Sequence, residues 1–434
     1  MKKYFAFMLA LLMIFLTACQ SDKVSGTSGE SDSKTDEKGG EKIEITYWYA
    51  WGDKIGENNE NLVKMFNESQ DKIHVKAEYQ GTYVDLHAKT QAAFAAGNAP
   101  EVTQNEISSI GVFAKSGMTQ DLTPFIERDD INMDDFNPGL MGNSYVDGKL
   151  YGLPYLRSTP ILYMNTTMLK EAGLDPAGPK TWDEFEEYLR ALTEEGKTVG
   201  MTMPVNIWIY EAFIASAGGQ MVADDDSKVL FNEKAGVKAL EFWKKLAQEG
   251  VIKVPGGETA ADVAKQDFAN SRAAMIFSST ADLSYNLSVA KEKGFELNTA
   301  FIPSDKQNAV PTGGANLVMT AGLEKDKQDA AWEFIKFMTA KEQTIYASKF
   351  TGYLPSRLSA VESEEMQALY KETPQFKVAV DQLQYGHPRP MAQEYPEIST
   401  VIADEITRTL LEKDLAPKDA LDAAAEKSNQ LLKK

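Results

Sequence analysis

The chain has 434 residues, of which 43% are hydrophobic and 25% are charged, and this composition is typical of a soluble globular protein with more than one domain. Its formal net charge of -19 argues against a nucleic-acid partner, because such a partner requires a basic surface. The charge leaves the chemical class of a small ligand open.

The N-terminal segment has the pattern of a signal peptide. Lys2 and Lys3 precede an uncharged apolar run from Tyr4 to Leu16. This run is shorter than the roughly 20 residues that a membrane-spanning helix needs. Cys19 follows it and is the only cysteine of the chain, so we interpret it as a lipid attachment point rather than half of a disulfide. A plain secreted protein is the alternative.

Residues 16–19 read Leu-Thr-Ala-Cys and resemble the lipobox of bacterial lipoproteins, which implies that the signal peptide 1–18 is removed and that Cys19 carries the lipid. Residues 19–42 are rich in Ser, Gly, Asp, Glu and Lys, so we predict a lipidated flexible tether there. We therefore expect an extracytoplasmic protein, anchored to the cell membrane by the lipid on Cys19 and in contact with the membrane through that anchor only.

The globular part opens with alternating strands and helices. Apolar residues alternate along 43–49 and again along 73–79, and helical spacing of apolar residues separates these two predicted strands. Strand, helix and strand predict a parallel pair, and ligands bind beyond the carboxyl ends of such strands. Three aromatic candidates for ligand contact lie at or just past a strand end: Trp48, Trp51 and Tyr83.

A second predicted helix, 86–96, stops at Gly97 and is followed by a short strand that ends at Asn105 and Glu106. Glu106 therefore also lies at a carboxyl end, where a carboxylate is available for the hydroxyl groups of a ligand.

Residues 148–165 are the stretch around which the rest of the chain is organised. Two apolar runs flank a polar interruption formed by Arg157, Ser158 and Thr159. A bend between two strand-like runs is how a chain passes from one lobe to another. We predict that the interruption lies at the floor of a cleft between two lobes and contacts a ligand there. An ordinary hairpin within a single domain is the alternative.

The remaining pattern stays α/β. Thr181 begins a capping box at the start of an amphipathic helix. Residues 224–226, three aspartates between apolar segments, predict a solvated turn rather than a calcium loop. An apolar run over 273–279 leads to Thr280, and a terminal amphipathic helix starts at Pro417.

Catalytic signatures are absent from the sequence. The three histidines, His74, His87 and His387, are scattered without cysteine or clustered carboxylates around them, so we expect no metal and no cofactor. The patterns HExxH and GxSxG do not occur, and no nucleophile with a base is readable. We expect a protein without enzymatic activity. A glycosidase with two facing carboxylates stays open, since the chain has 64 acidic residues.

Motifs spread over nearly all of the chain beyond the predicted signal peptide are similar to those of the solute-binding lipoproteins of ABC importers, in the carbohydrate-type family that includes the maltose-binding protein. These motifs are Asn98-Ala99-Pro100, the passage 153–165, Ala172-Gly173-Leu174-Asp175-Pro176 with Lys180-Thr181-Trp182, and Thr351-Gly352-Tyr353-Leu354-Pro355. Within the family the chain most resembles the sn-glycerol-3-phosphate and glycerophosphodiester binders. That likeness depends on Ser158-Thr159-Pro160-Ile161-Leu162-Tyr163, Gly313-Gly314-Ala315-Asn316-Leu317 and Asn429-Gln430-Leu431-Leu432.

The resemblance implies an α/β, two-lobed periplasmic-binding-protein-like fold of type II, with a hinge of crossing segments. It implies an N-terminal lobe made of 43–156 and 280–335, and a C-terminal lobe made of 157–279 and 336–434. It also implies a monomer that captures a small sugar or polyol phosphate and delivers it to the transmembrane subunits of an ABC permease.

The resemblance further implies a set of ligand-binding residues. They are Tyr83, Glu106, Ser158, Thr159, Trp208, Ser279, Thr280, Gly314, Tyr353 and Arg389. Arg389 corresponds to the phosphate-binding arginine of the family. The chain departs from the pattern at Val205, where a second tryptophan is expected, and in the spacing around Arg389. Glycerol-3-phosphate or a glycerophosphodiester, and a neutral mono- or oligosaccharide, both remain open as ligands, and a secreted carbohydrate hydrolase is the alternative of another class.

Overall fold

The computed structural model describes residues 42–257 and 259–433. The predicted signal peptide, Cys19 and the tether up to Glu41 lie outside the described residues. Within the described ranges, the helices are all too short or too polar to cross a membrane.

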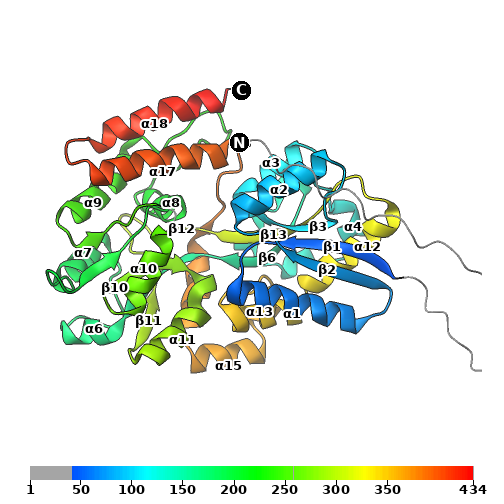
Figure 1. Cartoon of the computed structure of the whole chain (residues 1–434), viewed down its shortest axis with the longest axis horizontal. Helices are drawn as coiled ribbons and strands as arrows, with labels where there is room; N and C mark the ends of the chain where they lie inside the picture. The colour runs from blue at the N-terminus through cyan, green and yellow to red at the C-terminus, as the bar shows by residue number, and fades with distance from the viewer. Residues whose placement is uncertain (1–41, 258, 434) are drawn as a thin grey trace, which may run out of the picture. The chain divides into compact units, whose positions relative to one another are not determined.

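Two five-stranded sheets, each with its own covering helices, organise the described residues (Figure 1). The first sheet has the order β2-β1-β3-β13-β6, and the second has the order β11-β7-β10-β8-β9. In the first sheet β1 pairs in parallel with β2 and with β3, which confirms the predicted parallel pair. In the second sheet β7 is antiparallel to both of its neighbours.

The strands of the first sheet are β1 (Ile43–Tyr49), β2 (Ile73–Tyr79), β3 (Val102–Glu106), β6 (Leu153–Ser158) and β13 (Gly313–Met319). Those of the second are β7 (Pro160–Asn165), β8 (Val199–Thr202), β9 (Ile252–Lys253), β10 (Ala273–Ser279) and β11 (Leu297–Ala300). Two short pairs complete the strands: β4 (Tyr145–Val146) with β5 (Lys149–Leu150), and β12 (Val310–Pro311) with β14 (Gly386–His387).

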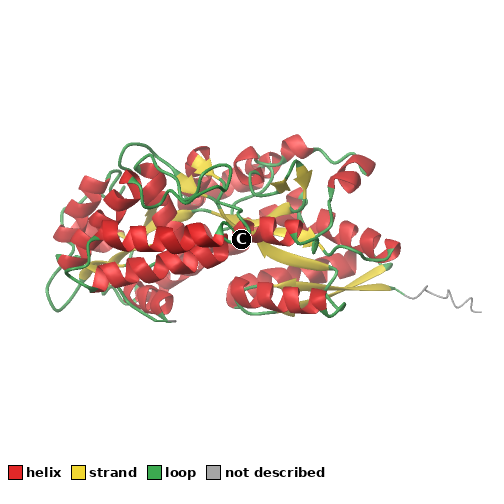
Figure 2. Ribbon diagram, turned by 90° about the horizontal axis from the view of Figure 1, so that it is seen from above, coloured by secondary structure: helices red, strands yellow, loops and turns green. Residues whose placement is uncertain are grey.

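The first sheet is accompanied by α1 (Asp53–Ser69), α2 (Tyr83–Ala95), α3 (Ile110–Lys115), α4 (Thr123–Arg128), α12 (Lys325–Met338) and α13 (Lys341–Thr351). One face of the second sheet is covered by α6 (Thr166–Glu171), α7 (Trp182–Ala191), α8 (Ile207–Ser216), α9 (Lys234–Gln248), α17 (Tyr395–Leu411) and α18 (Pro417–Leu431). The other face is covered by α5 (Pro138–Met141), α10 (Ala260–Ala269), α11 (Leu283–Lys293), α14 (Leu358–Val361), α15 (Glu364–Glu372) and α16 (Gln375–Gln382). Figure 2 shows helices on both sides of the strands.

The polar interruption of the sequence is the place where the chain changes sheets. β6 ends at Ser158 and pairs with β13 of the first sheet, whereas β7 begins at Pro160 and pairs with β10 and β11 of the second. A hairpin would require β6 and β7 to pair with each other, so the hairpin alternative is wrong. Thr159 is the residue between the two sheets, and the predicted passage is confirmed.

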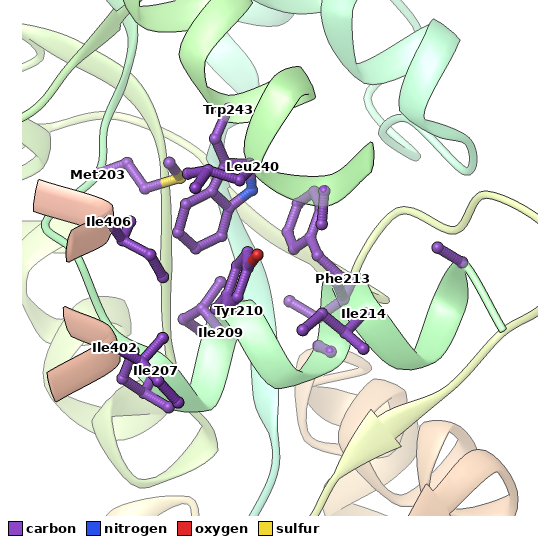
Figure 3. Close-up of a cluster of buried hydrophobic side chains, with 14 of the residues drawn as sticks. Met203, Ile207, Ile209, Tyr210, Phe213, Ile214, Leu240, Trp243, Ile402 and Ile406 are labelled. Atoms are coloured by element: carbon purple, nitrogen blue, oxygen red, sulfur yellow. The ribbon is translucent and has the colours of Figure 1, made fainter. Parts of the chain in front are cut away.

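The core of the second sheet explains the unusual composition of α8. In this helix every residue is buried except Trp208, because α8 is enclosed by neighbouring helices on several sides. Figure 3 shows Tyr210 and Phe213 of α8 beside Trp243 of α9, with Ile402 and Ile406 of α17 nearby. Trp208 is therefore available for another role.

The lobe boundaries stay a prediction: 43–156 with 280–335 for the N-terminal lobe, and 157–279 with 336–434 for the C-terminal lobe. Two segments pack with the other sheet than these boundaries imply. β11 was expected in the N-terminal lobe, yet it pairs with β7 of the second sheet. α13 was expected in the C-terminal lobe, yet its Ala347 is packed in the core of the first sheet. The reason is that the chain rejoins the first sheet at β13, and not directly after β10.

Several local signals can be compared with the sequence. The Thr181 side chain accepts a hydrogen bond from the Glu184 N–H at 3.2 Å and caps α7, but the Glu184 carboxylate accepts from the Lys180 N–H at 2.6 Å, so only half of the predicted capping box forms. The aspartate turn connects Val222 and Val229, which form an antiparallel bridge, so the predicted turn is confirmed. The terminal helix α18 begins at Pro417.

Candidate ligand-binding site

A cavity of about 400 Å³ takes its walls from both sheets. β3, β6 and β13 contribute from the first sheet, and α8 and β10 contribute from the second. Nine of the twelve residues predicted to bind a ligand line it: Trp51, Tyr83, Glu106, Ser158, Trp208, Ser279, Gly314, Tyr353 and Arg389. Segments separated by more than three hundred residues thus meet at one place.

The remaining three predicted residues lie elsewhere. Trp48 is on β1 between two residues of the core, so strand alternation points it to the opposite face, where its indole N–H donates to Glu78 at 2.8 Å. Thr159 and Thr280 are fully buried and bind each other: the Thr280 N–H donates to the Thr159 carbonyl at 3.0 Å. These two hydroxyl residues join the sheets below the cavity rather than facing it.

Aromatic rings form one wall of the cavity. The rings of Trp51 and Tyr83 meet edge to face with centroids 5.4 Å apart, and Trp51 is 37% exposed. Thr82 fixes the position of Tyr83, because the capping box that it forms with Asp85 starts α2 at Tyr83. The flat, partly exposed faces of such rings suit the C–H faces of a sugar or polyol.

His87 connects this wall to Glu106. Its ring stacks on Tyr83 at 6.4 Å, and the backbone N–H of Glu106 donates to its Nε2 at 3.3 Å. Burial lowers the pKa of His87 to about 4, and the Glu106 charge opposes that shift. The imidazole is therefore neutral at pH 7, as its role as an acceptor requires.

Two consecutive glycines on the cavity wall allow neighbouring groups to approach the backbone more closely than a side chain would permit. A Cβ on Gly313 would lie 2.4 Å from the Trp208 indole, and a Cβ on Gly314 would lie 2.0 Å from the Leu156 carbonyl oxygen. Gly314 also has a φ of +86°, a conformation that side chains disfavour. The Trp208 indole N–H donates to the Thr312 carbonyl at 3.0 Å, which holds the ring against the glycine backbone.

Arg389 lies between two carboxylates, one at the end of strand β3 of the first sheet and one on helix α8, which covers the second sheet. Its Nη1 donates to Glu106 at 2.8 Å, while its Nε and Nη2 fork onto Glu211 of α8 at 3.0 and 2.8 Å. Tyr395 donates its hydroxyl to the same Glu211 at 2.5 Å. Burial would lower the pKa of Arg389, but the charges of Glu211 and Glu106 outweigh it and hold that pKa above its ordinary value.

Arg157 of the polar interruption is fully buried below the floor. Its partners are neutral: the carbonyl oxygens of Gly313 and Leu140, the Asn316 side chain and the Thr312 hydroxyl, at 2.5 to 3.2 Å. Burial lowers the pKa of Arg157 to about 9. Of the predicted polar interruption, Ser158 alone lines the cavity.

Several residues of the cavity were not predicted from the sequence. They are Ile55, Pro204, Asn206, Ile209, Ala261, Ala264, Lys265, Ile276, Phe277, Ser278, Ala281 and Asp282. Lys265 and Asp282 form an ion pair at 3.3 Å. The local signal for Asn206 was readable, since it caps α8 by accepting the Trp208 N–H at 2.9 Å. Lys265 lies on α10, and nothing in its local sequence separates it from other surface lysines.

A second cavity, of about 540 Å³, contains Arg389 and Glu211 together with residues of 219–224 and 387–391. Arg389 is its only residue among the twelve predicted ones, all of which are described, so the smaller cavity is the candidate site.

The chain matches known proteins over most of its length. The family described as bacterial extracellular solute-binding protein matches residues 61–378. The sn-glycerol-3-phosphate-binding periplasmic protein of Pectobacterium atrosepticum is 28% identical over 416 residues, which cover 90% of this chain and 91% of that protein. The protein of the same name from Yersinia enterocolitica is 29% identical over 414 residues, with 90% and 92% covered.

Solved structures match the fold over similar lengths. The Mycobacterium tuberculosis UgpB structure in complex with glycerophosphocholine has a TM-score of 0.79 and 24% identity, covering 89% of this chain and 98% of that chain. The GacH receptor of Streptomyces glaucescens, whose structures include a complex with acarbose, has a TM-score of 0.81 and 20% identity, covering 91% and 99%. The predicted two-lobed α/β fold is thereby confirmed.

Proposed function

This chain belongs to the family of bacterial extracellular solute-binding proteins, and on that premise we propose that it captures a carbohydrate or a glycerol-phosphate-type solute in the 400 Å³ cavity and delivers it to an ABC permease. The observation that carries the proposal is the convergence of nine predicted ligand-binding residues, from both sheets, on that one cavity.

The chemistry of the walls supports a ligand rich in hydroxyl groups. Trp51, Tyr83 and Trp208 offer ring faces for C–H groups. The Glu106 carboxylate, Ser158 and Ser279 offer acceptors and donors for hydroxyl groups, and a hydrogen bond to a charged group contributes about 1.5–3 kcal/mol. The similar proteins described above bind sn-glycerol-3-phosphate or are in complex with glycerophosphocholine or acarbose, and these ligands are glycerol phosphates or carbohydrates.

Capture works by closure of two lobes around the ligand. Contacts from both sheets exist together only when the lobes are closed, so a ligand that makes them shifts the population toward the closed state. We propose that the passage at Thr159 and the crossing before β13 act as the hinge. The protein performs no reaction on its ligand, and it acts as a monomer.

The mature protein is held outside the cytoplasmic membrane by a lipid on Cys19. The support for this is the lipobox-like sequence at 16–19 and the polar composition of 19–42. Globomycin, which blocks lipoprotein signal cleavage, should leave the full-length precursor in cells, and a precursor processed normally in its presence would contradict the anchor.

Thermal unfolding with a ligand panel tests the proposed function. The panel contains maltose, maltotriose, glucose, sn-glycerol-3-phosphate and glycerophosphocholine. A ligand present at about 100 times its Kd adds roughly 2.7 kcal/mol to stability and raises Tm. We expect at least one member to raise Tm, and native mass spectrometry of the protein as purified should detect a bound solute. Hydrolysis of a chromogenic glycoside instead would favour the hydrolase alternative.

A further inference from the structure

The cavity contains cations, but each one already has an anionic partner. Lys265 and Arg389 are the positively charged residues among the described residues that line it. Lys265 pairs with Asp282 at 3.3 Å, and Arg389 pairs with Glu106 at 2.8 Å. A phosphate ester entering the cavity has to displace a carboxylate from one of them.

Displacement of a carboxylate from Arg389 is opposed most strongly by Glu211. It is 2% exposed and takes two of the three donating nitrogens of the guanidinium, at 3.0 and 2.8 Å. The Arg389 side chain is itself only 13% exposed. A phosphate that displaced Glu211 from Arg389 would therefore leave the Glu211 carboxylate buried without a cation. Glu211 lies on helix α8, whose other residues are apolar or small except for Tyr210 and Ser216, so no second cation on this helix is available to pair with it.

Arg157 is not a free cation for a phosphate in the cavity. It is fully buried, and neutral groups occupy its Nε, Nη1 and Nη2, so a ligand in the cavity cannot contact it. Of the charged residues that line the cavity, two are cations, Lys265 and Arg389, and two are carboxylates, Glu106 and Asp282, while Arg157 and Glu211 add one charge of each sign behind the lining. The formal charges cancel, and no surplus positive charge attracts an anion.

We infer that Glu211 determines the charge selectivity of the cavity: by holding Arg389 in ion pairs, it makes the site select an uncharged saccharide or polyol over a phosphate ester. This inference rests on the proposed function and narrows it to one ligand class. Ser108 occupies Oε2 of Glu106 with two hydrogen bonds, so a ligand hydroxyl binds the free lone pair of Oε1 without breaking the ion pair to Arg389. A phosphate instead competes with both carboxylates for one guanidinium.

Glu211→Gln tests the inference because it removes the charge and keeps the shape. Calorimetric titration with sn-glycerol-3-phosphate should give an affinity at least about tenfold higher for the variant than for the unmodified protein, since one charge-assisted partner of Arg389 is released to the ligand. Tyr395→Phe is the matched control. It removes one hydrogen bond to Glu211 and keeps the charge, so its affinity for sn-glycerol-3-phosphate should change by less than about threefold.

Other outcomes decide against the inference. Unmodified protein that binds sn-glycerol-3-phosphate more tightly than maltose, maltotriose and glucose overturns it while the proposed function stands. A folded Glu211→Gln protein without increased affinity for the phosphate ester also overturns it. If circular dichroism finds Glu211→Gln unfolded, Glu106→Gln removes the other carboxylate of Arg389 and should change the affinity in the same direction. A panel in which no compound binds either protein refutes the proposed function itself.

Discussion

Two buried arginines near Glu106 occupy regions with opposite electrostatics. In the Arg157 region, which we define as Arg157 with Leu140, Thr312, Gly313 and Asn316, the guanidinium donates to neutral oxygen atoms. In the Arg389 region, which we define as Arg389 with Glu106, Glu211 and Tyr395, the guanidinium is shared by two carboxylates.

The two pKa shifts record this difference. Burial lowers the pKa of Arg157 to about 9, because few charges compensate for the lost water. The same burial acts on Arg389, but the two carboxylates reverse it and its pKa is raised. A guanidinium held by backbone carbonyls fixes the chain where it crosses between sheets. One held by carboxylates controls which charges a neighbouring cavity accepts.

The largest expected effect is that of Arg389→Met, which leaves Glu211 and Glu106 without a cation. Breaking a buried ion pair costs about 3–5 kcal/mol of unfolding free energy. Urea unfolding of the variant and of the unmodified protein at pH 7.5 measures this cost.

A surface arginine is the control for Arg389→Met. The side chain of Arg190 is half exposed and pairs with Glu186 and Glu249. Arg190→Met should cost less than about 1 kcal/mol, as is usual for exposed ion pairs. Equal losses for the two substitutions would mean that the Arg389 region behaves as an ordinary surface network.

Arg157→Met should cost somewhat less, about 2–4 kcal/mol. Buried acceptors that lose their donor each cost about 1–3 kcal/mol, and this is partly offset because a desolvated charge is removed as well. Urea unfolding at pH 7.5 measures this cost as well. A loss below about 1 kcal/mol would show that the neutral acceptors do not depend on the guanidinium.

The smallest expected effect on the unfolding free energy is that of His87, which accepts a hydrogen bond from the Glu106 backbone N–H. Its pKa is lowered from 6.5 to about 4 in the fold, so below pH 6.5 the unfolded chain binds a proton that the folded one does not. Unfolding free energy should therefore fall by up to about 3 kcal/mol as pH drops from 6.5 to 4. The decline should be weaker in His87→Asn, followed by urea unfolding at half-unit steps. An unchanged decline in the variant would assign it to other groups.

Much of the fold was readable because it depends on neighbours in the chain. Alternation in 43–49 and 73–79 predicts β1 and β2, Thr181 caps α7, and Pro417 starts α18. The passage 148–165 was readable only in part: its two apolar runs around a polar interruption indicated a bend, but the hairpin alternative was excluded only by the pairing of β6 with β13 and of β7 with β10 and β11. Resemblance of local motifs then supplied eight residues of one cavity, and the strand-end argument supplied Trp51.

What the tertiary structure alone decided is the pairing of charges. Glu211 lies inside an apolar helix, 178 residues before Arg389, and no local pattern marks it as the partner of that arginine. The same holds for Trp48, whose position at a strand end resembles that of Trp51, while strand alternation turns its indole toward Glu78. The physical reason is that periodicity and caps are short-range properties of the chain. Which cation meets which carboxylate depends on how two separate sheets pack together.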